Sequence, residues 1–256
     1  MIAQTIRSAI SKLFSSITLL APLLCAVSLH AANCSMQSLS GFYGFVINGT
    51  SDGSPIAIVG LMATDGTGSI SGLETVSENG TILDSLEVLG KYNINSNCTG
   101  TLTIQGAGLA PQSFDVTLIS GGKAISMVET DSGTTESGTA MAEGPTACSS
   151  SRINGSYAIQ ATGAESATGP LALSGQINFH GDGTLNGTET TSVNGVITSG
   201  KVSGGYKIGN RCFGAASISV GNRNFIHLNL FVVNGGKGID FIQADSHTMV
   251  SGSMQQ

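Results

Sequence analysis

Residues 92–104 read YNINSNCTGTLTI, and residues 206–218 read YKIGNRCFGAASI. In both stretches a tyrosine lies six residues before a cysteine, and a glycine lies two residues after it. The offset between the stretches is 114 residues (212 minus 98), and it recurs for Cys34 and Cys148. Both cysteine pairs are therefore 64 residues apart. A repeat at a fixed offset predicts two tandem copies of one domain.

Other matched residues extend the repeat over most of the chain. Gly41-Phe42-Tyr43 corresponds to Gly155-Ser156-Tyr157, and Gly121-Gly122-Lys123 corresponds to Gly235-Gly236-Lys237. Near loops the offset drifts by a few residues, so that Asp65-Gly66 pairs with Asp182-Gly183. We predict that the first copy occupies residues 33–146 and the second residues 147–256.

The N-terminal residues 1–32 have the features of an export signal. Arg7 and Lys12 precede the apolar run from Ile17 to Val27, and Ala31-Ala32 offers a cleavage site. The run is shorter than the roughly 20 residues that a membrane-spanning helix needs. We therefore predict a secreted, periplasmic or cell-surface protein with no membrane span in its mature chain.

Four cysteines remain after removal of the signal, and their spacing favours two disulfides. Four cysteines allow three pairings, but only Cys34–Cys98 with Cys148–Cys212 preserves the symmetry of the two copies. Disulfides also fit an exported protein. Metal ligation by cysteine needs close spacings such as C-x₂-C, which this chain lacks, so no metal site is expected.

Apolar residues alternate along the mature chain, which predicts strands rather than helices. The first copy contains eight such segments, beginning with Tyr43, Phe45 and Ile47. Asn-Gly and Asp-Gly pairs such as Asn79-Gly80 lie between the segments and are typical of hairpin turns. The pattern predicts two all-β domains, each an up-and-down antiparallel eight-stranded β-barrel. Two β-sandwiches built from the same strands are the alternative.

This layout resembles small exported eight-stranded barrels of the avidin-like, lipocalin-like and allene-oxide-cyclase-like types. It also resembles uncharacterised secreted bacterial repeat proteins with three shared elements, here Gly41-Phe42-Tyr43, Asp65-Gly66-Thr67-Gly68 and Gly100-Thr101-Leu102-Thr103-Ile104. The chain has no tryptophan, which avidin-type pockets and the lipocalin Gly-x-Trp opening require. The resemblance therefore implies an architecture and assigns no site residue.

Glu74 and Glu189 are the candidate ligand-binding residues. They occupy matching places in the two copies and share strand parity with apolar residues, so both are predicted to point inward. A carboxylate inside a small barrel is costly unless it is hydrogen-bonded, and such groups often serve in ligand anchoring or acid–base work. The alternative is a solvated strand-end glutamate, or one paired with Lys91 or Lys201.

Other functional classes lack support in the residues. The net charge of −6 and the absence of a basic cluster disfavour nucleic-acid binding. His180, His227 and His247 are expected to be solvated, and no motif for catalysis or for a cofactor appears. We therefore expect a non-enzymatic module that binds a small apolar ligand or another surface, its partner being unknown. A structural or adhesive surface protein is one alternative, and an isomerase of the allene-oxide-cyclase type is another, by fold analogy only.

Overall fold

The computed structural model describes residues 33–144, 148–221 and 225–256. The predicted signal peptide, residues 1–32, lies outside the described residues. Strands dominate what is described, and within each copy consecutive strands pair antiparallel. Three single-turn 3₁₀ helices complete the elements: η1 Met36–Ser38, η2 Ser150–Arg152 and η3 Asn234–Gly236.

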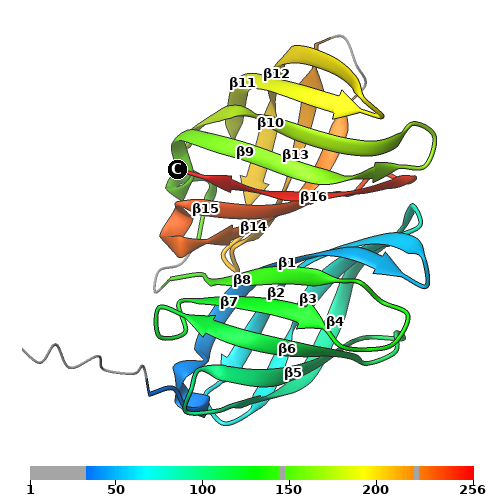
Figure 1. The fold of residues 1–256 in the computed structure, drawn as a ribbon. Helices are drawn as coiled ribbons and strands as arrows, with labels where there is room; N and C mark the ends of the chain where they lie inside the picture. Colours follow the sequence, from blue (N-terminus) through cyan, green and yellow to red (C-terminus); the bar gives the residue numbers. More distant parts are fainter. Residues whose placement is uncertain (1–32, 145–147, 222–224) are drawn as a thin grey trace, which may run out of the picture. The chain divides into compact units, whose positions relative to one another are not determined.

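The first copy forms one closed barrel (Figure 1). Its last strand pairs with its first, and Ala140 lies opposite Phe45 in that closing register. The strands are β1 Ser40–Ser51, β2 Ser54–Asp65, β3 Ser69–Glu78, β4 Thr81–Ile94, β5 Thr99–Gly106, β6 Gln112–Ile119, β7 Ala124–Glu129 and β8 Ser137–Ala142.

The second copy repeats this topology, and Gly252 lies opposite Ala161 where its barrel closes. The strands are β9 Asn154–Glu165, β10 Gly169–His180, β11 Thr184–Val193, β12 Val196–Ile208, β13 Phe213–Val220, β14 Ile226–Val233, β15 Gly238–Gln243 and β16 Thr248–Gln255. The prediction of two eight-stranded barrels is confirmed. The sandwich alternative is wrong, because each sheet closes on itself and leaves no free edge.

The two predicted disulfides are present, one in each copy. The Cα atoms are 4.9 Å apart in Cys34–Cys98 and 4.8 Å apart in Cys148–Cys212. Each bond ties the segment that precedes the first strand to the turn between the fourth and fifth strands of its barrel. The pairing thus closes equivalent loops in the two copies.

The repeated tyrosines are conserved between the copies because they hold this same end of each barrel. The Tyr92 hydroxyl donates to Leu39 O at 2.7 Å, and the Tyr206 hydroxyl donates to Ile153 O at 2.8 Å. Both acceptors lie in the segment that leads into the first strand. A buried tyrosine needs a partner for its hydroxyl, and here that partner is the chain entering the barrel.

The interior of the first barrel is filled by its own side chains. Tyr43, Phe45 and Phe114 are almost completely buried there. The inward Gly60 leaves no space for a ligand, because the Phe45 ring lies against it: a Cβ built on Gly60 would lie 2.6 Å from Phe45 Cζ. An eight-stranded barrel is only just wide enough for side chains, so small residues here admit large neighbours rather than a ligand.

The two barrels belong to one compact unit and share a small apolar cluster. Ala57 and Val59 of β2 pack with Phe231 of β14 and Ile242 of β15, and all four are buried. Asn229 adds a polar contact, since its Nδ2 donates to Asp84 Oδ1 at 2.8 Å. The outward faces of β2 and β14 are therefore covered, whereas most other strands keep a solvated outer face.

Replacement of Gly60 by alanine tests the filling of the first barrel. We expect Gly60→Ala to lower the free energy of unfolding by about 1–3 kcal/mol, because the new methyl group overlaps both the Leu73 carbonyl oxygen of the neighbouring strand and the Phe45 ring. Gly205→Ala is the matched control, since the nearest atom to a Cβ there is Gly183 O at 3.5 Å. Urea denaturation measures both, and equal stability of the two variants would contradict a filled interior.

Candidate functional site

Glu74 lies inside the first barrel, as its strand parity predicts. It is 1 % exposed, and neither of its carboxylate oxygens has a hydrogen-bond partner among the described residues. Burial raises the pKa of this carboxyl to about 7. Glu74 is therefore neither solvated nor paired with Lys91, which was the alternative interpretation of this residue.

Apolar side chains close the space around Glu74. Its partner across the β3–β4 ladder is Leu86, which packs against the barrel core together with Leu109. The carboxyl group points at Gly106 on β5, where a side chain would collide with it. The residue two positions along the strand is Val76, which offers no hydrogen bond. Apolar neighbours and the close approach of Gly106 thus leave Glu74 almost completely covered.

Glu189 occupies the matching position of the second barrel but has different neighbours. It is 5 % exposed, and the Thr191 hydroxyl donates to its Oε1 at 3.1 Å. Across the β11–β12 ladder it faces Gly200, where the first barrel has Leu86. Glycine there leaves open the space that the leucine side chain fills in the first barrel, although Glu189 itself stays buried.

The open space forms a small hollow at one end of the second barrel, which we name the barrel-2 hollow. Its volume is about 290 Å³. It is lined by Glu189, Thr191, Thr198, Ser199, Gly200, Val220 and Gly221. The lining combines a carboxylate and hydroxyl groups with one apolar side chain, Val220, so it is more polar than most small-molecule sites.

The structure also brings together two glutamates that the sequence analysis did not single out. Glu129 ends β7 and Glu136 precedes β8, and both are more than nine-tenths buried. Gln112 Nε2 donates to Glu136 Oε2 at 3.4 Å. Burial and the neighbouring Glu129 raise the pKa of Glu136 to about 8, so the pair holds a proton at neutral pH. The second copy has Gln243 and Val250 at these positions and no such pair.

A sequence signal for Glu129 was available. Ile125 and Met127 are inward residues of the same strand, and Glu129 continues their alternation. Glu136 carries no such signal, because it lies in the loop before β8 and is brought inside only by the pairing of Glu129 N with Glu136 O at 2.9 Å.

The histidines stay at the surface. His227 Nδ1 lies 2.7 Å from Asp245 Oδ1, and the same carboxylate accepts the His227 N–H. In the first copy Asp131 accepts the N–H of Ser113 in the same way, at 2.7 Å. Asp131 and Asp245 therefore hold the same loop in the two copies. The pairing of His227 with Asp245 belongs to this structural contact and does not define a catalytic pair.

A larger groove, which we name the side groove, is lined by residues from both faces of β1–β4, and Glu74 is one of them. Its volume is about 1230 Å³. Phe42 and Leu89 line it and are 61 % and 68 % exposed. The second barrel contributes the turn from Gly209 to Phe213, which includes Arg211 and Cys212.

The comparisons with known proteins do not name a function. The chain matches no known protein family and no curated protein. Among the described residues, no helix is long and apolar enough to cross a membrane. The class of protein defined by the fold is a tandem pair of closed antiparallel β-barrels, and the particular function is a matter for proposal.

The buried state of Glu74 predicts a characteristic pH dependence of stability. The folded-state pKa of Glu74, about 7, lies above its ordinary value of 4.5. The protonated side chain therefore contributes to the free energy of unfolding fully below pH 4.5, and this contribution is lost as the pH rises to about 7. We expect Glu74→Gln to reduce the loss of unfolding free energy between pH 4.5 and 8 by up to about 3 kcal/mol. Denaturant titration at several pH values measures this loss.

The exposed Glu87→Gln variant is the control for that series, because it removes a carboxylate from the same barrel without affecting the interior. If Glu74→Gln and Glu87→Gln change the pH dependence equally, then Glu74 is not the buried, unpartnered group described above.

Proposed function

We propose that this protein is an exported, non-enzymatic binding module whose ligand site is the barrel-2 hollow. The observation that carries the proposal is the contrast between the two copies. The same inward glutamate is covered by Leu86 in the first barrel and lies beside Gly200 in the second. A carboxylate with hydroxyl neighbours in an uncovered hollow supports ligand binding, whereas the covered one supports no such role.

The lining indicates the chemical class of the ligand. Glu189 attracts a hydrogen-bond donor or a positive charge, and Val220 offers apolar contact. A hollow of about 290 Å³ lies at the small end of the range for ligand sites. The ligand we propose is a small, largely apolar molecule that carries one amine or hydroxyl group.

The proposed export of the protein is supported by its disulfides. Both cysteine pairs of the described chain form disulfides, which is compatible with an exported protein. The division into a signal peptide of residues 1–32 and domains of residues 33–146 and 147–256 also remains a prediction. No cofactor enters this proposal.

A structural or adhesive role is the second candidate. The filled first barrel and the apolar cluster shared by the two barrels support a stiff spacer. The outer face of β5–β7 also presents Thr99, Thr101, Thr117 and Ser126 along a shallow concavity. The isomerase alternative needs an apolar cavity with a carboxyl group inside it. Glu74 borders the side groove but is only 1 % exposed, so this alternative rests on fold analogy alone.

Native mass spectrometry of the exported protein, purified gently, tests the binding proposal. We expect excess mass that leaves as a discrete small molecule on denaturation, and we expect it on the wild type and on Glu74→Gln. Gly200→Leu copies the first barrel and should close the hollow, while Glu189→Gln removes the charge that holds the ligand. Both variants should lose the bound mass.

The matched variants in the two copies make the result decisive. Bare protein in every sample would favour the structural or adhesive role. Equal loss of the ligand from Glu74→Gln and Glu189→Gln would place binding outside the barrel-2 hollow. Circular dichroism of each variant confirms that the barrels remain folded.

A further inference from the structure

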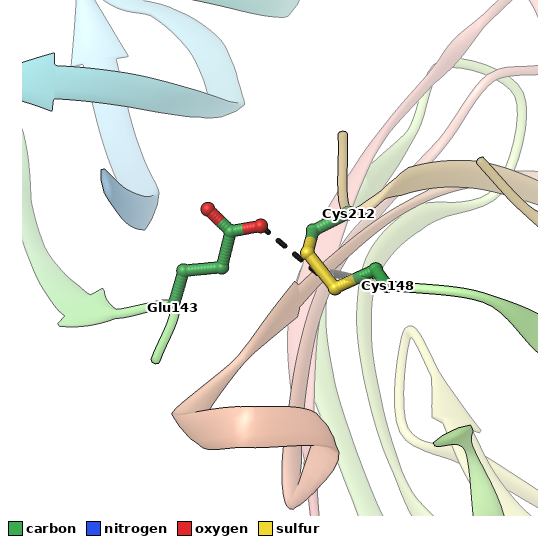
Figure 2. Close-up of side chains that lie close together, drawn as sticks. All are labelled: Glu143, Cys148 and Cys212. Atoms are coloured by element: carbon green, nitrogen blue, oxygen red, sulfur yellow. Dashed lines mark hydrogen bonds between the residues drawn. A yellow bond between two sulfur atoms is a disulfide. The ribbon is translucent and has the colours of Figure 1, made fainter. Parts of the chain in front are cut away.

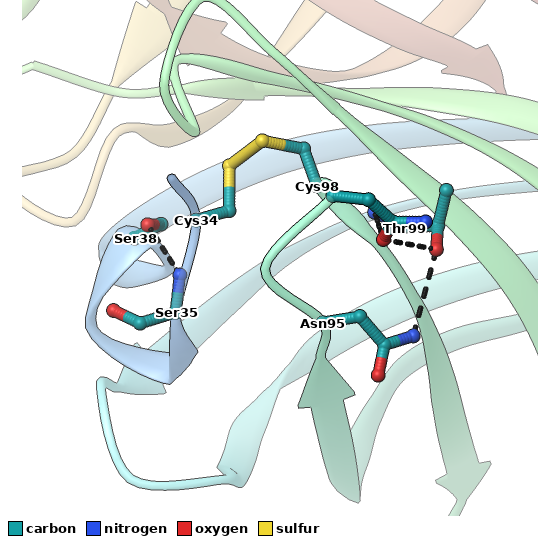
Figure 3. The surroundings of a disulfide bond; sticks show 7 residues. Cys34, Ser35, Ser38, Asn95, Cys98 and Thr99 are labelled. Carbon is teal, nitrogen blue, oxygen red and sulfur yellow. Dashed lines mark hydrogen bonds between the residues drawn. A yellow bond between two sulfur atoms is a disulfide. The ribbon is translucent and has the colours of Figure 1, made fainter. Parts of the chain in front are cut away.

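The two disulfides occupy equivalent places in the fold but have different neighbours. Figure 2 shows the carboxyl group of Glu143 directed at Cys148–Cys212, and Glu143 Oε1 lies 3.8 Å from Cys148 Sγ. Figure 3 shows neutral polar residues around Cys34–Cys98: Ser35, Ser38, Asn95 and Thr99. The second disulfide therefore has an acid beside one of its sulfur atoms.

Glu143 is held in this position by the backbone on both sides. Its N–H donates to Phe42 O at 2.8 Å, and its carbonyl accepts the Gly235 N–H at 2.6 Å. Only 9 % of the residue is exposed. It follows β8 in the segment that joins the two copies, so it is not part of the repeat.

Burial is the one cause that raises the pKa of Glu143, to about 7. The charged side chains of the surrounding elements are Glu87 and Arg211, which line the side groove with Glu143, together with Arg152, Lys237 and the buried Asp240 of β15. The Arg152 guanidinium is occupied by Gly235 O, to which Nη2 donates at 3.1 Å. Near neutral pH a substantial fraction of Glu143 therefore carries the proton that a departing thiolate needs.

We propose that Cys148–Cys212 is a redox-active disulfide that exchanges with dithiols, that Glu143 is its proton donor, and that Cys34–Cys98 is purely structural. This activity is independent of the ligand site in the barrel-2 hollow, since it involves no residue of that hollow.

The position of Glu143 assigns different roles to the two sulfur atoms. Cys148 Sγ lies beside the acid and is the leaving group, so a thiolate of the dithiol attacks Cys212 Sγ. Because Cys212 is 1 % exposed, this attack requires a local opening at the side groove that Cys212 lines. The S–S bond breaks, its electron pair moves to Cys148 Sγ, and that sulfur takes the proton of Glu143, which then regains a proton from solvent. The second thiol of the reductant loses its proton to solvent and attacks the mixed disulfide, releasing Cys212 as a thiolate that solvent protonates. The dithiol is oxidised to a disulfide, and the protein gains two thiols.

The exposure of the cysteines alone would predict that Cys34–Cys98 is reduced faster than Cys148–Cys212. Cys34 and Cys98 are 7 % and 9 % exposed, whereas Cys148 and Cys212 are 8 % and 1 % exposed. A faster reaction at the second pair therefore requires the acid. Once Glu143 is ionised, its negative charge opposes both the attacking and the departing thiolate. The faster reduction of Cys148–Cys212 is therefore expected in acid and is lost as the pH rises through about 7.

The test measures both disulfides in the same molecule. The folded protein is treated with dithiothreitol at pH values from 5.5 to 8.5, free thiols are alkylated, and peptide mapping gives the reduction rate of each pair. The concentration of attacking thiolate affects both rates equally, so their ratio isolates the local environment. We expect Cys148–Cys212 to react faster at pH 5.5 and this ratio to fall about tenfold by pH 8.5.

The variants separate proton donation from a general loosening of the fold. Glu143→Gln keeps the shape but donates no acidic proton, and it should make the ratio independent of pH. Glu87→Gln removes a carboxylate from the same groove and should leave the wild-type profile unchanged. Equal reduction rates of the two disulfides at all pH values, or a pH-dependent ratio that survives in Glu143→Gln, would overturn the proposal.

Discussion

The pairing of the first strand with the last is the constraint on which both halves of the molecule depend. Once β1 meets β8 and β9 meets β16, no backbone edge remains free in either sheet, and eight strands fix the width of each interior. The interior then has room for side chains and little else. This width explains why the Phe45 ring fills the space over Gly60, and why Glu74 is left without a hydrogen-bond partner.

Within this fixed frame the copies have diverged at a few inward positions. Exchange of a leucine for a glycine leaves open the space beside Glu189, and the change from Val76 to Thr191 gives this glutamate a hydroxyl partner. The glutamate pair near the end of the first barrel is replaced by neutral residues in the second. The disulfides differ because Glu143 belongs to the connecting segment and not to the repeat. Duplication thus preserved the scaffold, while the chemistry of the two copies became different.

The sequence was informative wherever spacing or alternation decided the outcome. Equal cysteine spacing implied the two disulfides, alternation gave the strands, and hairpin residues such as Asn79 and Gly80, both at positive φ, gave their connections. It was less informative about strands with two apolar faces. Residues 230–233 read LFVV without alternation, because Phe231 and Val233 are buried on the outer face of β14. The equivalent β6 alternates, since its outer face is solvated.

The sequence by itself therefore determined the repeat, the strand order, the disulfide pairing and the inward direction of Glu74 and Glu189. These follow from local backbone geometry and from the symmetry of the copies, which a linear pattern records. Only the tertiary structure decided which glutamate is covered, that Glu136 joins Glu129, and that Glu143 meets Cys148. Each of those outcomes depends on side chains from strands or loops far apart in the chain, whose contacts are set by barrel closure and register.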